Sequence, residues 1–219
     1  MIKNILTVGD SFTYGEELVD RTLAWPWLLG NKISADVVNM ARPGSGNKRM
    51  IRYVMEHISD SNPVDLIVVA WSSPGRMEFA DEDGFFDIWP GYSGNMFLQH
   101  QPWRTKLLDY INRHHNDEYL YRQYLLDVIL LQSFLKDRGI KYVMCRALGN
   151  EHYYNQYHYK DTKLVSLVNK DYFPGWPDTG MMEWTYGTEQ GPNGHFLEAG
   201  HQIVANQIYE HIRHLGWIS

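Results

Sequence analysis

Near its start the chain reads Lys3-Asn4-Ile5-Leu6-Thr7-Val8-Gly9-Asp10-Ser11. Lys3 to Val8 has the length and composition of a short buried β-strand, and a glycine and two polar residues end it. In sheets built from parallel strands, ligands bind beyond the carboxyl ends of the strands. This stretch therefore predicts a strand that delivers Ser11 to a candidate site, although the serine hydroxyl could instead only cap the following turn.

Short apolar runs alternate with helical segments along the rest of the chain. Val64 to Ala70 is the clearest further strand, because a continuous apolar run of this length is typical of a strand buried on both faces. The other expected elements are strands at Ala35–Met40 and Ile140–Cys145, and helices at Ala24–Lys32, Asn47–Ser59, Trp103–His115, Asn116–Arg138 and Leu197–Leu215. The alternation predicts βαβ units, and hence an α/β fold: a three-layer α/β/α sandwich with a flavodoxin-like, mostly parallel central sheet.

Length and composition narrow the class of protein. The 219 residues, of which 44% are hydrophobic, fit one domain over residues 1–219 with an ordinary core. The net charge of −6 argues against nucleic acid as a partner. The single cysteine, Cys145, excludes an internal disulfide and a multi-cysteine metal site, and we expect neither a metal nor a cofactor. No leader-like or membrane-spanning stretch stands out, so we expect a cytoplasmic protein.

Two segments are rich in aromatic residues, glycine and proline. They lie near residues 71–103 and 150–193, and both are predicted to be long ordered loops inserted into the domain. Long loops in a compact domain are usually functional, and their aromatic content argues against disorder.

Three loops follow predicted strands and should meet at one edge of the sheet: Gly9–Ser11, Gly44–Asn47 and Trp71–Ser73. Their residues suit nucleophilic chemistry, because a serine hydroxyl needs a base to take its proton and fixed donors for the oxyanion that forms. Gly44 can present a backbone N–H to that oxyanion, and Ser72 can offer a hydroxyl. His195 precedes the last helix, which would fold it back onto the same edge.

These residues resemble the SGNH or GDS esterase/lipase superfamily over nearly the whole chain. The first block of that family looks like Val8-Gly9-Asp10-Ser11, the second like Asn39-Met40-Ala41-Arg42-Pro43-Gly44, and the last like Gly194-His195 before Gly200-His201. The resemblance implies that Ser11 is the nucleophile and His195 its base. It also implies that the backbone N–H groups of Ser11 and Gly44 hold the oxyanion.

The chain departs from that family pattern in two places. The third block of the family carries Gly-x-Asn, whereas the chain has Ala70-Trp71-Ser72, so that Ser72 holds the place of the oxyanion-binding asparagine. The family's acid stands three residues before the histidine, where the chain has Pro192. Three replacements for the acid stay open: Asn193 orienting the ring through its carbonyl oxygen, Glu189 from the preceding loop, or a backbone carbonyl.

Several residues near the expected site have competing interpretations. Asp10, Trp71 and Arg76 are the candidate substrate contacts, although Asp10 could also fix its loop and Arg76 could be a structural ion-pair partner. His201 is a rival base, because an acid, Glu198, stands three residues ahead of it. However, its place in an apolar helical stripe favours a role in the core.

The function that the sequence favours is hydrolysis of a small acyl ester, with O-acetyl groups on a carbohydrate as the first expected substrate. Aromatic loops suit the faces of sugars, and the loop that carries Gly44, the expected oxyanion donor, leaves little space for a long acyl chain. One alternative is a catalytically impaired member that binds a glycan or a protein. Another is an FMN-binding flavodoxin, because Gly9-Asp10-Ser11-Phe12-Thr13 loosely resembles a hydroxyl-rich phosphate loop. The oligomeric state stays open.

Overall fold

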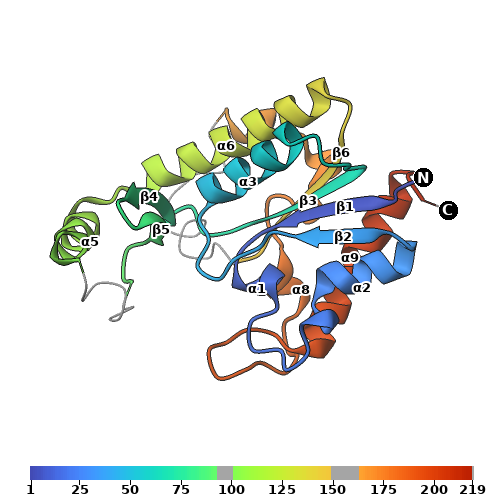
Figure 1. Ribbon diagram of the computed structural model, residues 1–219, viewed down its shortest axis with the longest axis horizontal. Helices are drawn as coiled ribbons and strands as arrows, with labels where there is room; N and C mark the ends of the chain where they lie inside the picture. Colours follow the sequence, from blue (N-terminus) through green and yellow to red (C-terminus); the bar gives the residue numbers. More distant parts are fainter. Residues whose placement is uncertain (93–100, 149–162, 219) are drawn as a thin grey trace.

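The computed structural model describes residues 1–92, 101–148 and 163–218. Its described residues contain a central sheet of four parallel strands in the order β2-β1-β3-β6 (Figure 1). The strands are β1 (Asn4–Val8), β2 (Asp36–Asn39), β3 (Leu66–Trp71) and β6 (Lys141–Arg146). All four predicted strands and the parallel sheet are therefore confirmed, with strand ends shifted by a few residues at most.

Helices cover both faces of the sheet, as Figure 1 shows. The helices α2 (Trp25–Ile33) and α9 (Glu198–His214) pack on one face, and α3 (Asn47–Ser59) and α6 (Asp117–Asp137) on the other. Successive strand residues point to opposite faces, so Ile67 and Val69 join the α3/α6 core while Leu66 and Val68 join the α2/α9 core. The predicted three-layer α/β/α sandwich is confirmed.

A second, two-stranded sheet interrupts the predicted loop near residues 71–103. It consists of β4 (Met77–Asp81) and β5 (Gly84–Ile88), which pair antiparallel outside the central sheet. The helix α5 (Pro102–His114) follows. The hairpin escaped prediction because Phe85 is exposed and Phe86 is buried, so apolar residues face both sides and blur the alternation that identifies a half-buried strand.

The second aromatic segment, near residues 150–193, lies partly outside the described residues. From residue 163 onward it forms short helical turns joined by loops: η3 (Val165–Leu167), η4 (Lys170–Tyr172) and α8 (Met181–Trp184). Phe173 and Met181 are buried in it, so this part of the segment is ordered and belongs to the core. No described helix is long and apolar enough to cross a membrane.

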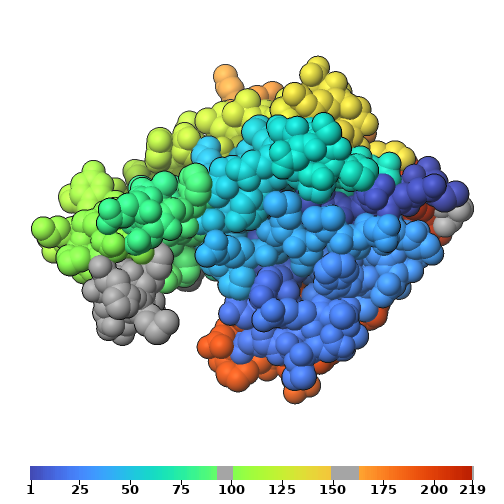
Figure 2. Space-filling model, in the orientation of Figure 1, coloured from blue at the N-terminus to red at the C-terminus, as the bar shows by residue number. Residues whose placement is uncertain are grey.

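The carboxyl ends of the parallel strands gather at one end of the sheet, where β1 leads into α1 (Ser11–Tyr14). A 3-10 turn, η1 (Arg21–Leu23), connects this segment to α2. In the space-filling view a hollow separates the green hairpin region from the blue N-terminal residues and the orange residues ahead of α9 (Figure 2). The candidate site residues lie at this end of the molecule.

Candidate active site

Ser11 is the first residue of α1, directly beyond the end of β1. Asp10 caps this short helix by accepting a hydrogen bond from the Phe12 N–H at 3.1 Å. The cap turns the chain sharply at Ser11, which is 4% exposed. Neither the hydroxyl nor the backbone N–H of Ser11 donates a hydrogen bond to any described residue. Both donors are therefore available to a ligand at this point.

His195 lies beside α1, with a carboxylate on its ring. Its Nδ1 is 2.8 Å from Oε2 of Glu17, and its ring centroid is 4.8 Å from that of Phe12, the residue after Ser11. The His195 and Glu17 side chains are 13% and 9% exposed, so water screens their contact only partly. The hydrogen bond fixes the tautomer with the proton on Nδ1 and leaves Nε2 as an acceptor. Glu16 lies further off, with Oε2 3.8 Å from Nε2.

The rest of the Glu17 carboxylate is held by the same loop that carries His195. Oε1 accepts hydrogen bonds from the N–H and Nδ2 of Asn193, at 2.9 and 3.2 Å, and Oε2 also accepts one from the His195 N–H at 3.2 Å. Burial raises the pKa of Glu17, but these hydrogen bonds outweigh it and hold the pKa below its ordinary value of 4.5. Glu17 is therefore ionised at neutral pH.

The backbone around Glu17 also indicates a specific arrangement. Glu17 has φ of 69°, a left-handed conformation that is uncommon for a residue with a side chain. A Cβ on Gly191 would lie 2.6–2.8 Å from the carboxyl atoms of Glu17. Glycine at position 191 therefore lets the loop approach the carboxylate closely enough for the bonds from Asn193 and His195.

The structure thus places Glu17 against the ring of His195, the predicted base, where the sequence offered Asn193, Glu189 or a backbone carbonyl. Asn193 contacts Glu17 instead of the ring, and the exposed Glu189 has no side-chain bond to a described residue. No spacing pattern could have found Glu17, because it lies 178 residues from His195 in the chain. His201 is 1% exposed and accepts a hydrogen bond from the Trp25 N–H at 3.2 Å, which confirms its predicted place in the core.

Gly44 lies in the loop between β2 and α3, with φ of 76°. Its N–H donates to no described residue, as the predicted oxyanion donor requires. The ring of Trp89 covers the Gly44 α-carbon: two of its edge atoms lie 3.6 and 3.7 Å from the place of a Cβ on Gly44. Trp89 was missed by sequence reasoning, because nothing local distinguishes it from the other aromatic residues of its segment.

Ser72 and Arg76 both contact the buried Asp10. The Ser72 hydroxyl donates to Asp10 Oδ2 at 2.7 Å, and Arg76 Nη1 lies 3.2 Å from the same oxygen. Arg76 also stacks over Trp89, 4.8 Å from its centroid. In this arrangement the Ser72 proton is committed to Asp10, and Ser72 can donate to an oxyanion only by leaving it. Asp10 is fully buried, and its bonds to Ser72, Arg76 and the Phe12 N–H suit the fixing of its loop.

Trp71 takes a different place from the substrate contact expected for it. It is fully buried and packs edge-on against Tyr124 of α6, 5.9 Å between ring centroids. As the last residue of β3 it points into the α3/α6 core, because it continues the face of Ile67 and Val69. A substrate at the edge of the sheet cannot reach this side chain in the structure described.

Comparison with solved structures shows that the chain has the fold of the SGNH hydrolases. TesA superposes with a TM-score of 0.58 at 13% identity, over 97% of this chain and 99% of that one. A family 2 carbohydrate esterase with a carbohydrate-binding domain, from Corynascus thermopiles (Myceliophthora fergusii), gives 0.61 at 16% identity, over 98% of this chain and 67% of that one. The psychrotrophic esterase EstA from Pseudoalteromonas sp. gives 0.57 at 11%, over 97% and 98%.

The sequence itself matches a family over residues 14–219, described as "Family of unknown function (DUF6071)". The chain belongs to this family. No curated protein matches it significantly in sequence. Identities of 11–16% to the solved structures establish a shared fold, and the chemistry has to be argued from the residues of this chain.

Proposed function

We propose that the chain is a serine esterase that cleaves small acyl esters, with Ser11 as nucleophile, His195 as base and Glu17 as the acid that orients the base. One observation carries the proposal: the 2.8 Å contact between His195 Nδ1 and Glu17, formed beside the helix that begins with Ser11. An ionised carboxylate on Nδ1 is what a histidine needs in order to accept a proton at Nε2 and bear the resulting charge.

The proposed reaction runs through an acyl-enzyme. Ser11 Oγ attacks the ester carbonyl carbon as its proton passes to His195 Nε2, and the C–O bond to the alcohol then breaks as His195 returns that proton to the leaving oxygen. Water, deprotonated by His195 in the same way, attacks the acyl-Ser11 ester. The acyl C–O bond then breaks, His195 returns the proton to Ser11 Oγ, and the carboxylic acid is released. Glu17 stays ionised throughout and stabilises the imidazolium in both halves of the reaction.

The oxyanion of each tetrahedral intermediate needs hydrogen-bond donors that are in place before the reaction. The backbone N–H groups of Ser11 and Gly44 are free of described partners and belong to adjoining loops at one end of the sheet. We assign them as the two donors. Ser72 becomes a third donor only if its hydroxyl leaves Asp10.

The acyl group is expected to be small because Trp89 covers Gly44. We infer that a carbonyl oxygen bound to the Gly44 N–H would place its acyl group near the Trp89 indole, which stacks on Arg76, and that this neighbour favours a short chain. We propose O-acetyl groups on a carbohydrate as the substrate. The carbohydrate esterase among the solved structures with this fold supports that choice.

A second candidate function is binding of a glycan or a protein without turnover. The observation that favours it is the bond between Ser72 and Asp10, which leaves two backbone donors where the resemblance implies a third from a side chain. Loss of one such donor lowers the rate about 10²–10³-fold.

The deciding experiment measures hydrolysis of p-nitrophenyl acetate by the wild type, by Ser11→Ala and by a control, Ser133→Ala. Ser133 is an exposed serine on α6 whose hydroxyl, among the described residues, bonds only the carbonyl of Ile129, so its loss should change nothing. We expect Ser11→Ala to abolish turnover with the thermal midpoint preserved, and a fluorophosphonate to label Ser11. Turnover that survives Ser11→Ala, or a label on another serine, would refute the proposal. Wild-type protein that binds acetylated glycans without cleaving them would favour the second candidate.

A further inference from the structure

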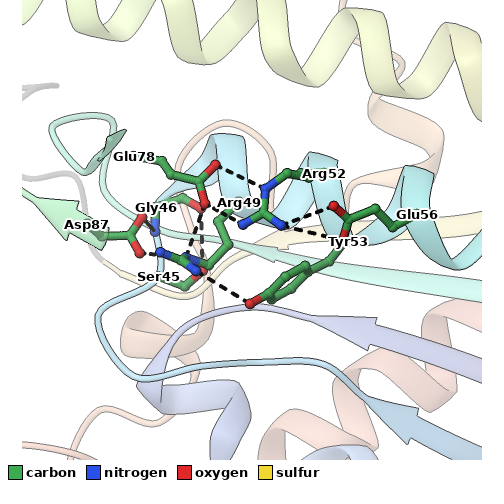
Figure 3. Close-up of polar contacts among 8 residues, drawn as sticks. All are labelled: Ser45, Gly46, Arg49, Arg52, Tyr53, Glu56, Glu78 and Asp87. Carbon is green, nitrogen blue, oxygen red and sulfur yellow. Dashed lines mark hydrogen bonds and ion pairs between the residues drawn. The ribbon is translucent and has the colours of Figure 1, made fainter. Parts of the chain in front are cut away.

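The β4–β5 hairpin is fixed to α3 by a buried network of charges (Figure 3). Glu78 and Asp87 stand directly opposite each other in the hairpin, a pairing that would repel if nothing lay between them. Arg49 of α3 lies between them, with Nε 2.6 Å from Asp87 Oδ2 and 3.4 Å from Glu78 Oε1. The Arg49 side chain is 2% exposed, so these carboxylates replace the water it has lost.

The same network extends one turn along α3. Arg52 Nη2 lies 2.7 Å from Glu78 Oε1, and its Nη1 lies 3.1 Å from Glu56. Arg49 also donates to the Tyr53 hydroxyl at 3.4 Å. A two-stranded hairpin is marginally stable by itself in water, so the hairpin depends on such contacts for its place.

Asp87 also contacts a segment outside this network, the loop Gly44–Gly46 that precedes α3. Its Oδ1 accepts a hydrogen bond from the Gly46 N–H at 2.9 Å, while Oδ2 holds Arg49. The approach is close, because a Cβ on Gly46 would lie 2.9 Å from Asp87 Oδ1 and 2.9 Å from the Arg76 carbonyl. The loop that carries Gly44 is thus held by the hairpin at its junction with α3.

We propose that Asp87 is a positioning residue for the oxyanion donor Gly44. Asp87 accepts a hydrogen bond from the Gly46 N–H, and Arg49 holds the Asp87 carboxylate in place. Asp87 and Arg49 together fix the loop, so that the Gly44 N–H, which has no described partner, faces the site. This inference rests on the proposed function, since it concerns the aim of one of its donors. A misplacement of about 1 Å in such a group can lower a rate about 10²-fold.

The test compares Asp87→Ala with Asp81→Ala. Asp81 belongs to the same hairpin and pairs with Arg104, but forms no hydrogen bond or ion pair with the described residues Gly44–Gly46. We expect its loss to loosen the hairpin without touching the loop. Two readouts are taken at a temperature where both variants are folded: backbone amide hydrogen exchange over residues 42–47, and the kinetic constants kcat and KM for p-nitrophenyl acetate.

We expect Asp87→Ala to speed exchange of the Gly46 amide and to lower kcat about 10–100-fold with KM within about twofold, because the oxyanion forms after substrate binds. Asp81→Ala should leave both readouts within about twofold of wild type. Equal exchange in the two variants would overturn the inference, and so would faster exchange without a fall in kcat. If wild-type turnover does not depend on Ser11, the proposed function fails, and the exchange data alone then decide whether Asp87 holds the loop.

A conservative variant keeps the inference testable if Asp87→Ala does not fold. Asp87→Asn retains a side-chain oxygen for the Gly46 N–H, but its NH2 group takes the place of the oxygen that accepts from Arg49 Nε, so the contact with the loop is kept and the contact with Arg49 is lost. Its loop exchange should lie closer to wild type than to Asp87→Ala, and its kcat should fall less than in Asp87→Ala. A tenfold or larger loss of kcat with unchanged exchange would show that the charge, and not the contact with the loop, is what the reaction needs.

Discussion

Replacing Glu17 by alanine tests the assignment of the acid most directly. The change removes four hydrogen bonds at once: two from Asn193 to Oε1, and two from the ring and the N–H of His195 to Oε2. His195 then loses the group that keeps its proton on Nδ1 and offsets its charge in the transition state. In serine hydrolases, loss of this group lowers kcat about 10⁴-fold.

We expect kcat for p-nitrophenyl acetate to fall about 10³–10⁴-fold in Glu17→Ala. The smaller loss applies if water refills the space at Nδ1, which the 13% exposure of the His195 side chain allows. Glu17→Gln separates charge from orientation. Its amide oxygen can face His195 while its NH2 group takes the place of Oε1. The Asn193 side-chain amide can flip to accept from that NH2 group, whereas the Asn193 backbone N–H loses its acceptor. This variant keeps the ring oriented and should lose less than Glu17→Ala.

Glu16→Ala is the matched control, because Glu16 is the adjacent acid, is 41% exposed and lies 3.8 Å from the other ring nitrogen. An exposed ion pair of that length contributes little, so kcat should stay within about threefold of wild type. The reasoning is refuted if Glu17→Ala keeps kcat within about threefold while it remains folded. It is equally refuted if Asn193→Ala or Glu189→Ala lowers kcat more than Glu17→Ala does.

Glu17 also predicts a dependence of stability on pH. Its pKa in the folded protein lies below the ordinary value of 4.5, so its ionisation favours the fold fully above that pH and the contribution is lost as the pH falls below it. Chemical denaturation of wild type and Glu17→Gln should therefore give stability curves that converge as the pH drops below 4.5. Curves that stay parallel through this window would show that the Glu17 carboxylate has no net stabilising contacts.

Neighbouring groups yield three more expectations. Ser72→Ala should lower the free energy of unfolding by about 1–3 kcal/mol in urea titrations, because buried Asp10 loses a hydrogen-bond donor. Unchanged stability together with a roughly 100-fold loss of turnover rate would place the Ser72 hydroxyl at the oxyanion instead. Trp89→Ala should shift the preference among p-nitrophenyl esters from acetate toward hexanoate, and an unchanged preference would remove Trp89 from the acyl pocket. Burial lowers the pKa of His201 to about 3, so as the pH falls the unfolded chain takes up a proton at this residue before the folded chain does. The free energy of unfolding therefore falls with decreasing pH between about 6.5 and 3, and His201→Asn should flatten that fall in denaturation experiments across this range.

The central sheet could be predicted from the sequence because its strands carry their signal locally. Leu66 to Trp71 is apolar without a break and rich in β-branched residues, and a run of this length and composition is typical of a parallel strand buried on both faces. The hairpin lacks such a signal, since its position depends on Glu78 and Asp87 meeting arginines of α3. Charged residues in a strand indicate a solvent-exposed face until the partner that buries them is known.

The same distinction separates the parts of the site. Ser11 and Gly44 follow strand ends, so the rule that parallel strands end at one edge was enough to bring their loops together. Glu17 is visible only in three dimensions, because a tight loop from the far end of the chain lies against it: the Gly191 N–H donates to the His195 carbonyl at 2.8 Å. Trp71 is fully buried although it adjoins Ser72 in the sequence, because the position of a residue in its strand, and not its sequence neighbour, decides which face of the sheet its side chain points to.

An acid supplied from the segment after Ser11 changes what the histidine loop has to do. In the pattern that the resemblance implies, one loop carries both acid and base, and the two are positioned together. In this chain the proposed nucleophile, Ser11, shares one short segment with Glu17, and the loop brings only the proposed base, His195. The other residues of this loop hold it against the Glu17 carboxylate: Gly191 allows the close approach, and Asn193 donates two hydrogen bonds to Oε1. Pro192 at the family's acid position is therefore consistent with a working site, because no carboxylate is needed there once Glu17 occupies Nδ1.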